Sequence, residues 1–197
     1  MGDRAALAAL AEGEVVTTLT LDPSLSCTGY AVFSGAALDS AGIIRVPDTG
    51  KGRTQWARVA AALDDLTGIL QSLPADGSVT VVVETPQTVT RGKRGQRSAS
   101  SLPGYGMIVG AMLAHVRAYI AAKAPGWSLV EVSATVWTKG YPSTNNDPHK
   151  TRRVRAAEYL YPSAAGKLGA ETTAGNVADA ILMGDWWVKH RAGAGAA

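Results

Sequence analysis

Residues 15–33, VVTTLTLDPSLSCTGYAVF, contain two extended stretches joined by a short turn. Apolar residues alternate with threonines over Val15–Leu21, a pattern typical of a half-buried strand. Pro23 and the nearby serines predict a turn after Asp22, and Thr28–Phe33 predicts a second strand. Strands this close in sequence pair as an antiparallel hairpin. The segment therefore predicts the start of an antiparallel sheet, with a carboxylate at the end of its first strand.

The remaining chain changes from strand-like to helix-like periodicity and back. Apolar residues at helical spacing alternate with short β-branched runs, which is typical of strands joined by crossover helices and paired in parallel. We expect a small-residue turn over 34–40, strands over 42–46, 79–84 and 127–132, and helices over 56–70, 105–122, 149–160 and 174–190. The order predicts an α/β arrangement. Its mixed five-stranded sheet has three antiparallel strands, then parallel strands, and is flanked by helices.

Length and composition limit the classes of protein that the chain can be. Its 197 residues suit a single domain, which we place at 15–190, after an N-terminal extension (1–14) and before a flexible tail (191–197). One cysteine, Cys27, excludes an intrachain disulfide and a cysteine-rich zinc site and fits a reducing compartment. We find no signal-like segment and no stretch long and apolar enough to span a bilayer. We therefore expect a cytoplasmic protein, in a bacterium or a phage-infected cell.

Three acidic residues lie at the ends of two predicted strands and in the last predicted helix, where we expect these elements to meet. Asp22 and Glu84 each end an apolar strand, and Asp179 lies in the last helix, with Asn176 on the same helical face. Converging hard oxygen ligands are what Mg²⁺ requires, and two such ions can activate water and stabilise a leaving oxygen. Each acid taken alone also fits a turn former, a helix cap or a partner of the helix dipole.

Basic residues gather after Glu84 and again near the start of the helix over 149–160. No acidic residue occurs between Glu84 and Glu131. Basic side chains beside a metal site would neutralise phosphates and position a duplex, although both clusters also fit solvated surfaces. The two clusters are Arg91, Lys93, Arg94 and Arg97, and then Lys150, Arg152, Arg153 and Arg155.

Several of these segments resemble the motifs of the RuvC Holliday-junction resolvases, which belong to the RNase H-like superfamily. The resemblance covers roughly 16–187 in the correct order, and its first and last motifs are the most specific. The matching segments are Leu21-Asp22-Pro23 continuing to Thr28-Gly29-Tyr30, Val82-Val83-Glu84, Tyr105–Gly110, Val130–Val136 with His149–Val154, and Asn176-Val177-Ala178-Asp179-Ala180.

The resemblance implies an RNase H-like fold and a homodimer. The dimer is expected to depend on Mg²⁺, with Mn²⁺ able to replace it, and to resolve four-way DNA junctions by paired symmetric nicks. By the same resemblance, Asp22, Glu84 and Asp179 are catalytic metal ligands, and Asn176 stands in the place of a further acidic ligand. Lys150 approaches the scissile phosphate and stabilises charge there.

The chain departs from the family pattern at several positions. Asn176 removes one negative charge, and Thr85-Pro86-Gln87 lacks the aromatic residue that often follows the glutamate. Trp137 stands near the expected position of a second lysine, for which Lys139 is a candidate replacement in DNA binding. These differences, with an insertion over 140–148, predict a divergent member of the kind carried by phages or other mobile elements.

Other functions remain open from the residues alone. One is an RNase H-like nuclease that cuts an RNA–DNA hybrid, a flap or a fork, because a fold does not settle the substrate. Another is a junction-binding protein without cleavage activity, which Asn176 favours. A third is an actin-like nucleotide-binding fold, because 22–29 also resembles its phosphate loop. Since that fold normally needs two such domains, and no Gly-Lys-Ser/Thr loop occurs, we expect no nucleotide cofactor.

Overall fold

The five strands form one mixed sheet, in the order β3-β2-β1-β4-β5. The structure, a computed structural model, describes residues 15–45, 55–75, 78–85, 102–142, 150–166, 168 and 171–194. β1 pairs antiparallel with β2, which pairs antiparallel with β3, while β4 pairs parallel with β1 and β5. The bounds are β1 (Thr17–Asp22), β2 (Cys27–Ser34), β3 (Ala37–Arg45), β4 (Val79–Thr85) and β5 (Ser128–Ser133). The predicted fold class is therefore confirmed.

The sheet register places two of the predicted site residues at one edge. Leu21 of β1 pairs with Val83 of the parallel strand β4, so Asp22 and Glu84 follow at the same end of neighbouring strands. Glu84 in turn pairs with Val132 of β5. The carboxyl ends of the three parallel strands therefore meet beside both carboxylates.

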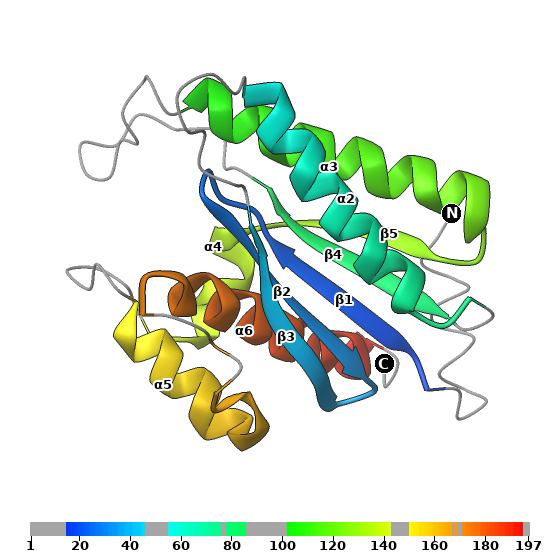
Figure 1. Ribbon diagram of the computed structural model, residues 1–197. Coiled ribbons are helices and arrows are strands. Elements are labelled where there is room, and N and C mark those ends of the chain that lie inside the picture. The colour runs from blue at the N-terminus through cyan, green and yellow to red at the C-terminus, as the bar shows by residue number, and fades with distance from the viewer. Residues whose placement is uncertain are drawn as a thin grey trace.

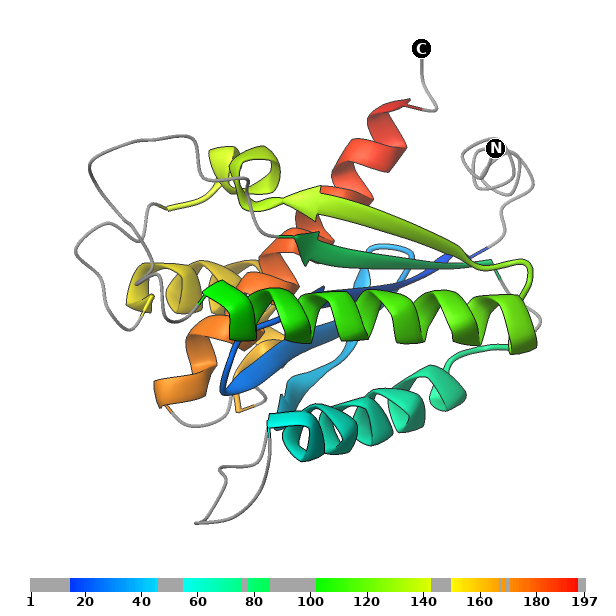
Figure 2. The ribbon, with the colours of Figure 1, turned by 90° about the horizontal axis from the view of Figure 1, so that it is seen from above.

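Helices cover both faces of this sheet. In Figure 1, α2 (Gln55–Ser72) and α3 (Leu102–Lys123) lie across one face, while α6 (Glu171–Ala194) and α5 (Thr151–Leu160) lie on the other. Figure 2, seen from above, shows α2 and α3 running alongside each other. A short helix, α4 (Ala134–Trp137), and a 3-10 turn, η1 (Thr138–Gly140), follow β5. A second turn, η2 (Pro162–Ala164), follows α5.

The central strand β1 is buried on both faces, not on one as its alternation predicted. Its leucines, Leu19 and Leu21, pack into the core beneath α2 and α3. Thr18 and Thr20 alternate with these leucines and point the other way, and the Oγ1 of Thr20 donates a 2.7 Å hydrogen bond to the carbonyl of Ala180 in α6. A threonine can bond a helix carbonyl while its methyl group packs. Alternating Leu and Thr therefore fits a strand covered on both sides.

Three predicted boundaries differ in the structure. β3 begins at Ala37, not at Gly42, because the turn that precedes it is tight and uses Gly35 at φ 58°. α6 continues to Ala194, and Arg191 within it is buried, so the flexible tail predicted from 191 is helical over its first residues. α5 begins at Thr151, directly after Lys150, which takes the left-handed conformation at φ 52°.

The expectation that no stretch could span a bilayer was too strict. Within the described ranges, one segment, Gly104–Lys123, is long and apolar enough by length and composition, with a mean hydropathy of 1.3. In this fold, Ile108, Met112 and Val116 of that segment are buried in the core against the sheet. The apolar character of α3 is therefore used, at least on that face, to cover the sheet (Figure 1).

Candidate functional site

Three carboxylates from separate elements gather at the end of the sheet where β1 and β4 terminate. Asp22, Glu84 and Asp179 keep only 6%, 9% and 3% of their surfaces exposed. Asp22 is the last residue of β1, Glu84 is the penultimate residue of β4, and Asp179 lies on α6, which packs across β1 and β2. Buried carboxylates need compensating charge or hydrogen bonds. Burying these three carboxylates therefore costs folding stability, which is typical of a functional site.

Gly29 allows α6 to reach this end of the sheet. It lies on β2 opposite Asp22. A Cβ built on it would lie 2.0 Å from the backbone oxygen of Asn176 and 2.8 Å from the backbone nitrogen of Val177. Only glycine permits so close an approach of strand and helix. This contact brings the first turns of α6, with Asn176 and Asp179, to the end of β1.

Lys150 connects the carboxylates through its ammonium group. Its Nζ donates to Oδ2 of Asp179 and, at 3.1 Å, to Oδ1 of Asn176, and it lies 3.8 Å from Oδ2 of Asp22. The side chain passes over Gly175, where a Cβ would lie 2.8 Å from the lysine Cδ. The left-handed backbone at Lys150 and the missing side chain at Gly175 together place this cation among the acids.

Arg153 lies inside the site and does not face outward. Its Nη1 donates a 2.8 Å hydrogen bond to Oδ1 of Asp179, and its Nε donates to the carbonyl of Pro142 at 3.3 Å. Only 11% of its side chain is exposed. The sequence predicts that Arg153 contacts DNA phosphate. In the structure its guanidinium instead binds the carboxylate of Asp179.

Trp137 holds Glu84, a role that sequence reasoning missed. The indole is fully buried, and its Nε1 donates a 2.8 Å hydrogen bond to Oε2 of Glu84. The sequence showed only that a tryptophan stood where a lysine was expected. A usable signal was present, because a buried indole N–H needs an acceptor. Trp137 also follows β5, which lies beside β4, the strand that carries Glu84.

Burial sets the electrostatics of the site. Removal from water raises the pKa of Asp22 well above its usual range, and neighbouring Lys150 offsets only part of that shift. Burial likewise raises the pKa of Glu84, against the lowering effect of the Trp137 hydrogen bond. Burial alone would lower the pKa of Lys150, but Asp22 and Asp179 outweigh it, so that pKa is raised. The site thus favours a bound positive charge.

The donor atoms fit a hard divalent cation by type. Asn176 directs its amide nitrogen to Ser24 Oγ and to the carbonyl and Sγ of Cys27, so its Oδ1 faces Lys150 and the acids. Three carboxylates and one amide oxygen are ligands that Mg²⁺ accepts. In the part of the chain that the structure describes, no three His, Cys, Asp or Glu side chains form a ready metal cluster. The Lys150 ammonium instead supplies the positive charge between Asp22 and Asp179.

The remaining predicted site residues fall into two groups. Lys139 in η1 and Arg152 in α5 are exposed. Arg91, Lys93, Arg94 and Arg97 lie outside the described residues, in a segment that follows directly after β4 and Glu84 in the sequence. The predicted pairing of these cations with phosphate stays a prediction.

Comparison with known proteins rests on structure alone. The sequence matches no protein-family model and no curated protein. Thermus thermophilus RuvC in complex with a Holliday junction substrate superimposes with a TM-score of 0.52 at 15% identity, over 89% of this chain and 96% of that one. This chain therefore has the fold of RuvC. Another T. thermophilus RuvC structure matches at a TM-score of 0.45 and 15% identity, over 90% of this chain and 96% of that one. A nuclease-domain structure of the large terminase subunit of bacteriophage Sf6 matches at 0.28 and 13%, over 88% and 70%.

The RuvC-like fold confirms the resemblance at the level of architecture. Within it, four oxygen donors come from three elements: Asp22 from β1, Glu84 from β4, and Asn176 and Asp179 from α6. Residues about 150 positions apart in the sequence meet at one edge of the sheet, as the hydrogen bond between Asn176 and Ser24 shows directly.

Proposed function

We propose that this chain is a divalent-metal-dependent DNA endonuclease that resolves four-way junctions by paired symmetric nicks. The observation that carries the proposal is the convergence of Asp22, Glu84 and Asp179, with Lys150 among them, at one edge of the RuvC-like sheet. Buried carboxylates beside a lysine suit phosphodiester hydrolysis, in which charge develops on phosphate oxygens.

The acids and the amide would hold the metal. Asp22 is central, because it ends the middle strand and lies near both Glu84 and Lys150, whose charges affect its pKa. Glu84 and Asp179 flank it, and Asn176 presents its Oδ1. When bound, divalent ions supply activation of a water molecule and stabilisation of the leaving oxygen. The chain's own residues then orient the donors and exclude bulk water.

Lys150 would stabilise charge on the phosphate. Its Nζ carries a firmly held proton, because the surrounding carboxylates raise its pKa. Cation binding by Asp22 and Asp179 would release this ammonium from its present partners. It would then donate to a phosphate oxygen at the same edge of the sheet.

Exposed cations near this edge would position the duplex. Lys139 follows β5, and Arg152 follows Lys150 on α5. The segment with Arg91, Lys93, Arg94 and Arg97 continues directly from β4. Contacts of this kind bind the backbone without reading sequence, which favours selection of a junction by its shape.

Paired nicks need two sites, and we assign the dimer surface to α3. Gly106, Gly110 and Ala114 are exposed at successive helical turns. A Cβ at either glycine would meet nothing within 4 Å. The face is therefore open and shallow enough for a second copy of this helix. Light scattering at micromolar concentration should give the mass of a dimer, and a monomer would contradict paired nicking.

The decisive test is cleavage of a labelled four-way junction, a matched linear duplex and an RNA–DNA hybrid, with Mg²⁺ and with EDTA. Wild type should nick the junction in symmetric pairs only with the metal, and Asp22→Asn should not. Cleavage of the hybrid instead would identify an RNase H-type enzyme. Tight junction binding without cleavage in Mg²⁺ or Mn²⁺ would identify a binding protein.

A further inference from the structure

We propose that Trp137 and Arg153 are positioning residues that hold Glu84 and Asp179 in place for metal binding. We call this pair the Trp137–Arg153 bracket. The inference rests on the proposed function, because it assigns a task to residues behind the proposed metal ligands. It adds two residues, one aromatic and one cationic, that bind no substrate themselves.

The first arm of the bracket is the hydrogen bond from Trp137 to Glu84. The indole Nε1 lies 2.8 Å from Oε2, and the tryptophan is 0% exposed. A single donor on a buried carboxylate fixes the side-chain rotamer, because no water competes for the bond. The bond uses Oε2 and leaves Oε1 outside it, on a carboxylate at the end of β4.

The second arm runs from the same indole to Asp179 through Arg153. The guanidinium carbon lies 5.1 Å from the centre of the Trp137 ring, a cation–π distance. Its Nη1 donates to Oδ1 of Asp179 at 2.8 Å. Oδ2 of the aspartate is bound by Lys150. One aromatic ring therefore supports both carboxylates, one through its edge and one through its face.

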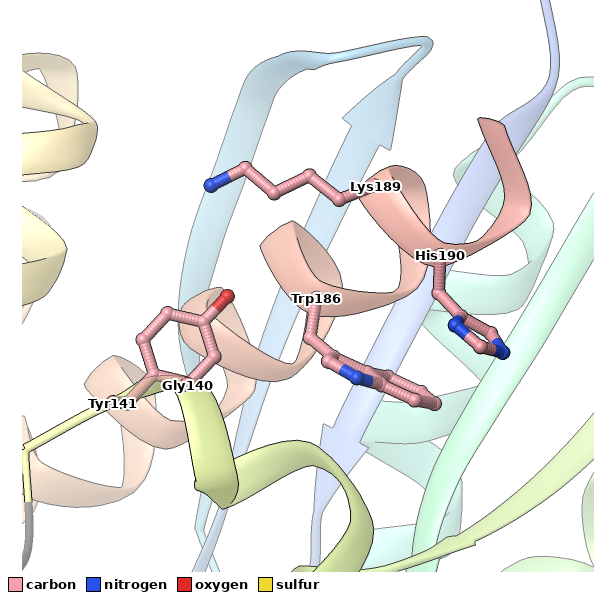
Figure 3. Close-up of a pocket in the computed structure, with 5 residues that line it drawn as sticks. All are labelled: Gly140, Tyr141, Trp186, Lys189 and His190. Atoms are coloured by element: carbon pink, nitrogen blue, oxygen red, sulfur yellow. The ribbon is translucent and has the colours of Figure 1, made fainter. Parts of the chain in front are cut away.

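The ring itself is held from a further side. Tyr141 lies with its ring centre 6.1 Å from that of Trp137, and its hydroxyl donates to Asp185 of α6. Figure 3 shows Tyr141 at the end of η1, extending toward α6 in the pocket that Trp186, Lys189 and His190 also line. The Nε of Arg153 donates to the carbonyl of Pro142, which directly follows Tyr141 in the sequence. The bracket is thus fixed to α6 at both ends.

The bracket supplies a link that the main packing does not. Besides its contact with α5, α6 packs on the sheet against β1, β2 and β3, so Asp179 is well placed relative to Asp22. Glu84 lies on β4, one strand beyond that contact. The path Glu84–Trp137–Arg153–Asp179 joins the two carboxylates across this gap. Groups behind metal ligands commonly set ligand orientation and change metal affinity by about 10–100-fold when replaced.

Two substitutions test the bracket without changing the net charge. Trp137→Phe keeps an aromatic ring and removes the N–H. Arg153→Lys keeps the cation and removes the planar guanidinium, which lysine does not replace at a stacked site. Matched controls are Trp186→Phe, on α6, and Arg155→Lys, at an exposed position on α5. Mn²⁺ binding to the full chain is measured by calorimetry without DNA, together with the melting temperature in EDTA.

We expect each bracket variant to bind Mn²⁺ about 10–100-fold more weakly, while both controls bind it as wild type does. The double variant should lose less than the product of the two single losses, because the arms act as one unit. A second readout is the indole N–H resonance of Trp137, assigned by its absence in Trp137→Phe. Glu84→Gln and Arg153→Lys should both shift it, and Arg155→Lys should not.

The outcomes separate the bracket from the proposed function. Weakened Mn²⁺ binding in the bracket variants of a protein that cuts no DNA would support the bracket and overturn the function. Unchanged Mn²⁺ affinity in both bracket variants would overturn the bracket, whatever the protein cuts. Equal losses in the variants and their controls would also overturn it, as would a wild-type chain that binds no divalent cation.

Discussion

The Nζ of Lys150 lies 3.8 Å from Oδ2 of Asp22 and donates to Oδ2 of Asp179, so one ammonium serves two buried carboxylates. The lysine side chain is 30% exposed, whereas the two acids are nearly inaccessible to water. A tethered cation of this kind offsets part of the cost of burying the acids. It occupies the region in which we propose that divalent cations bind. Metal-free stability and metal binding are therefore linked through this side chain.

Replacing Lys150 by Met should make folding more dependent on metal. The variant loses the positive charge beside Asp22 and Asp179, which should lower the metal-free unfolding free energy by roughly 1–3 kcal/mol, less than the ~3–5 kcal/mol for a fully buried pair. Added Mg²⁺ should then raise its melting temperature more than it raises that of wild type. Scanning calorimetry in EDTA and in Mg²⁺ measures both effects.

Lys189→Met is the control for this experiment. Lys189 also pairs with a buried acid, Asp185, at 2.7 Å, but its side chain is 64% exposed and two tyrosines also donate to that acid. Its loss should cost less than about 1 kcal/mol, as for exposed pairs, with no added response to Mg²⁺. Equal behaviour of the two variants would remove Lys150 from the proposed link.

Metal-free stability should fall as the pH rises toward neutrality. Burial raises the pKa values of Asp22 and Glu84 above their reference values of 3.8 and 4.5, so the folded state favours the protonated forms. Their contribution is complete below the unfolded pKa values and is lost as the pH passes through the raised folded values. This loss is measured as the melting temperature in EDTA at steps of about one pH unit between roughly pH 5 and 8.

Asp22→Asn should weaken this pH dependence and stabilise the metal-free protein at neutral pH, because burial raises the pKa of Asp22 and so opposes its ionised form. The amide keeps the shape of the side chain and removes the buried charge. Asp64→Asn, at an exposed position on α2, is the control. A loss of stability in Asp22→Asn at neutral pH would show that the carboxylate is already well compensated.

Much of the fold could be predicted because its signals are local. β-branched runs indicated β4, helical periodicity indicated α2, and short spacing indicated the hairpin of β1 and β2. The sheet edge then follows from strand order, since parallel neighbours end together. This is why Asp22 and Glu84 could be placed side by side from sequence alone.

The interior of the site could not be predicted in the same way. The place of Arg153 depends on a ring, Trp137, that comes from another element and is fixed only after α4 packs. Arginines on a helix look alike in sequence, and Arg152 and Arg153 differ only in which side of α5 meets α6. The left-handed backbone at Lys150 could not be predicted, because that position holds neither glycine nor asparagine, the residues that usually adopt this conformation. Such features depend on tertiary packing and not on local pattern.

Replacing Gly29 by Ala should disrupt the site through packing alone. The new Cβ would lie 2.0 Å from the backbone oxygen of Asn176, and neither strand nor helix backbone can easily give way. We expect a loss of several kcal/mol, about 3 or more, or displacement of α6 with loss of activity. Chemical unfolding measures it. Gly68→Ala, exposed in α2 with nothing within 4 Å of its Cβ, should instead stabilise by about 0.5–1 kcal/mol.

The basic segment after β4 should contribute directly to DNA affinity. Arg94 and Arg97 lie outside the described residues, but their segment begins where Glu84 and Thr85 end β4, beside the carboxylates. If both arginines contact phosphate, replacing them by Ala lowers the slope of log K against log salt by about 2, near 0.9 for each contact. Lys123→Ala is the control, because Lys123 ends α3 just before β5 begins, at the opposite edge of the sheet. Junction binding titrated between low and moderate salt measures both slopes. An unchanged slope in the double variant would place the DNA away from this segment and shift the phosphate contacts to Lys139 and Arg152.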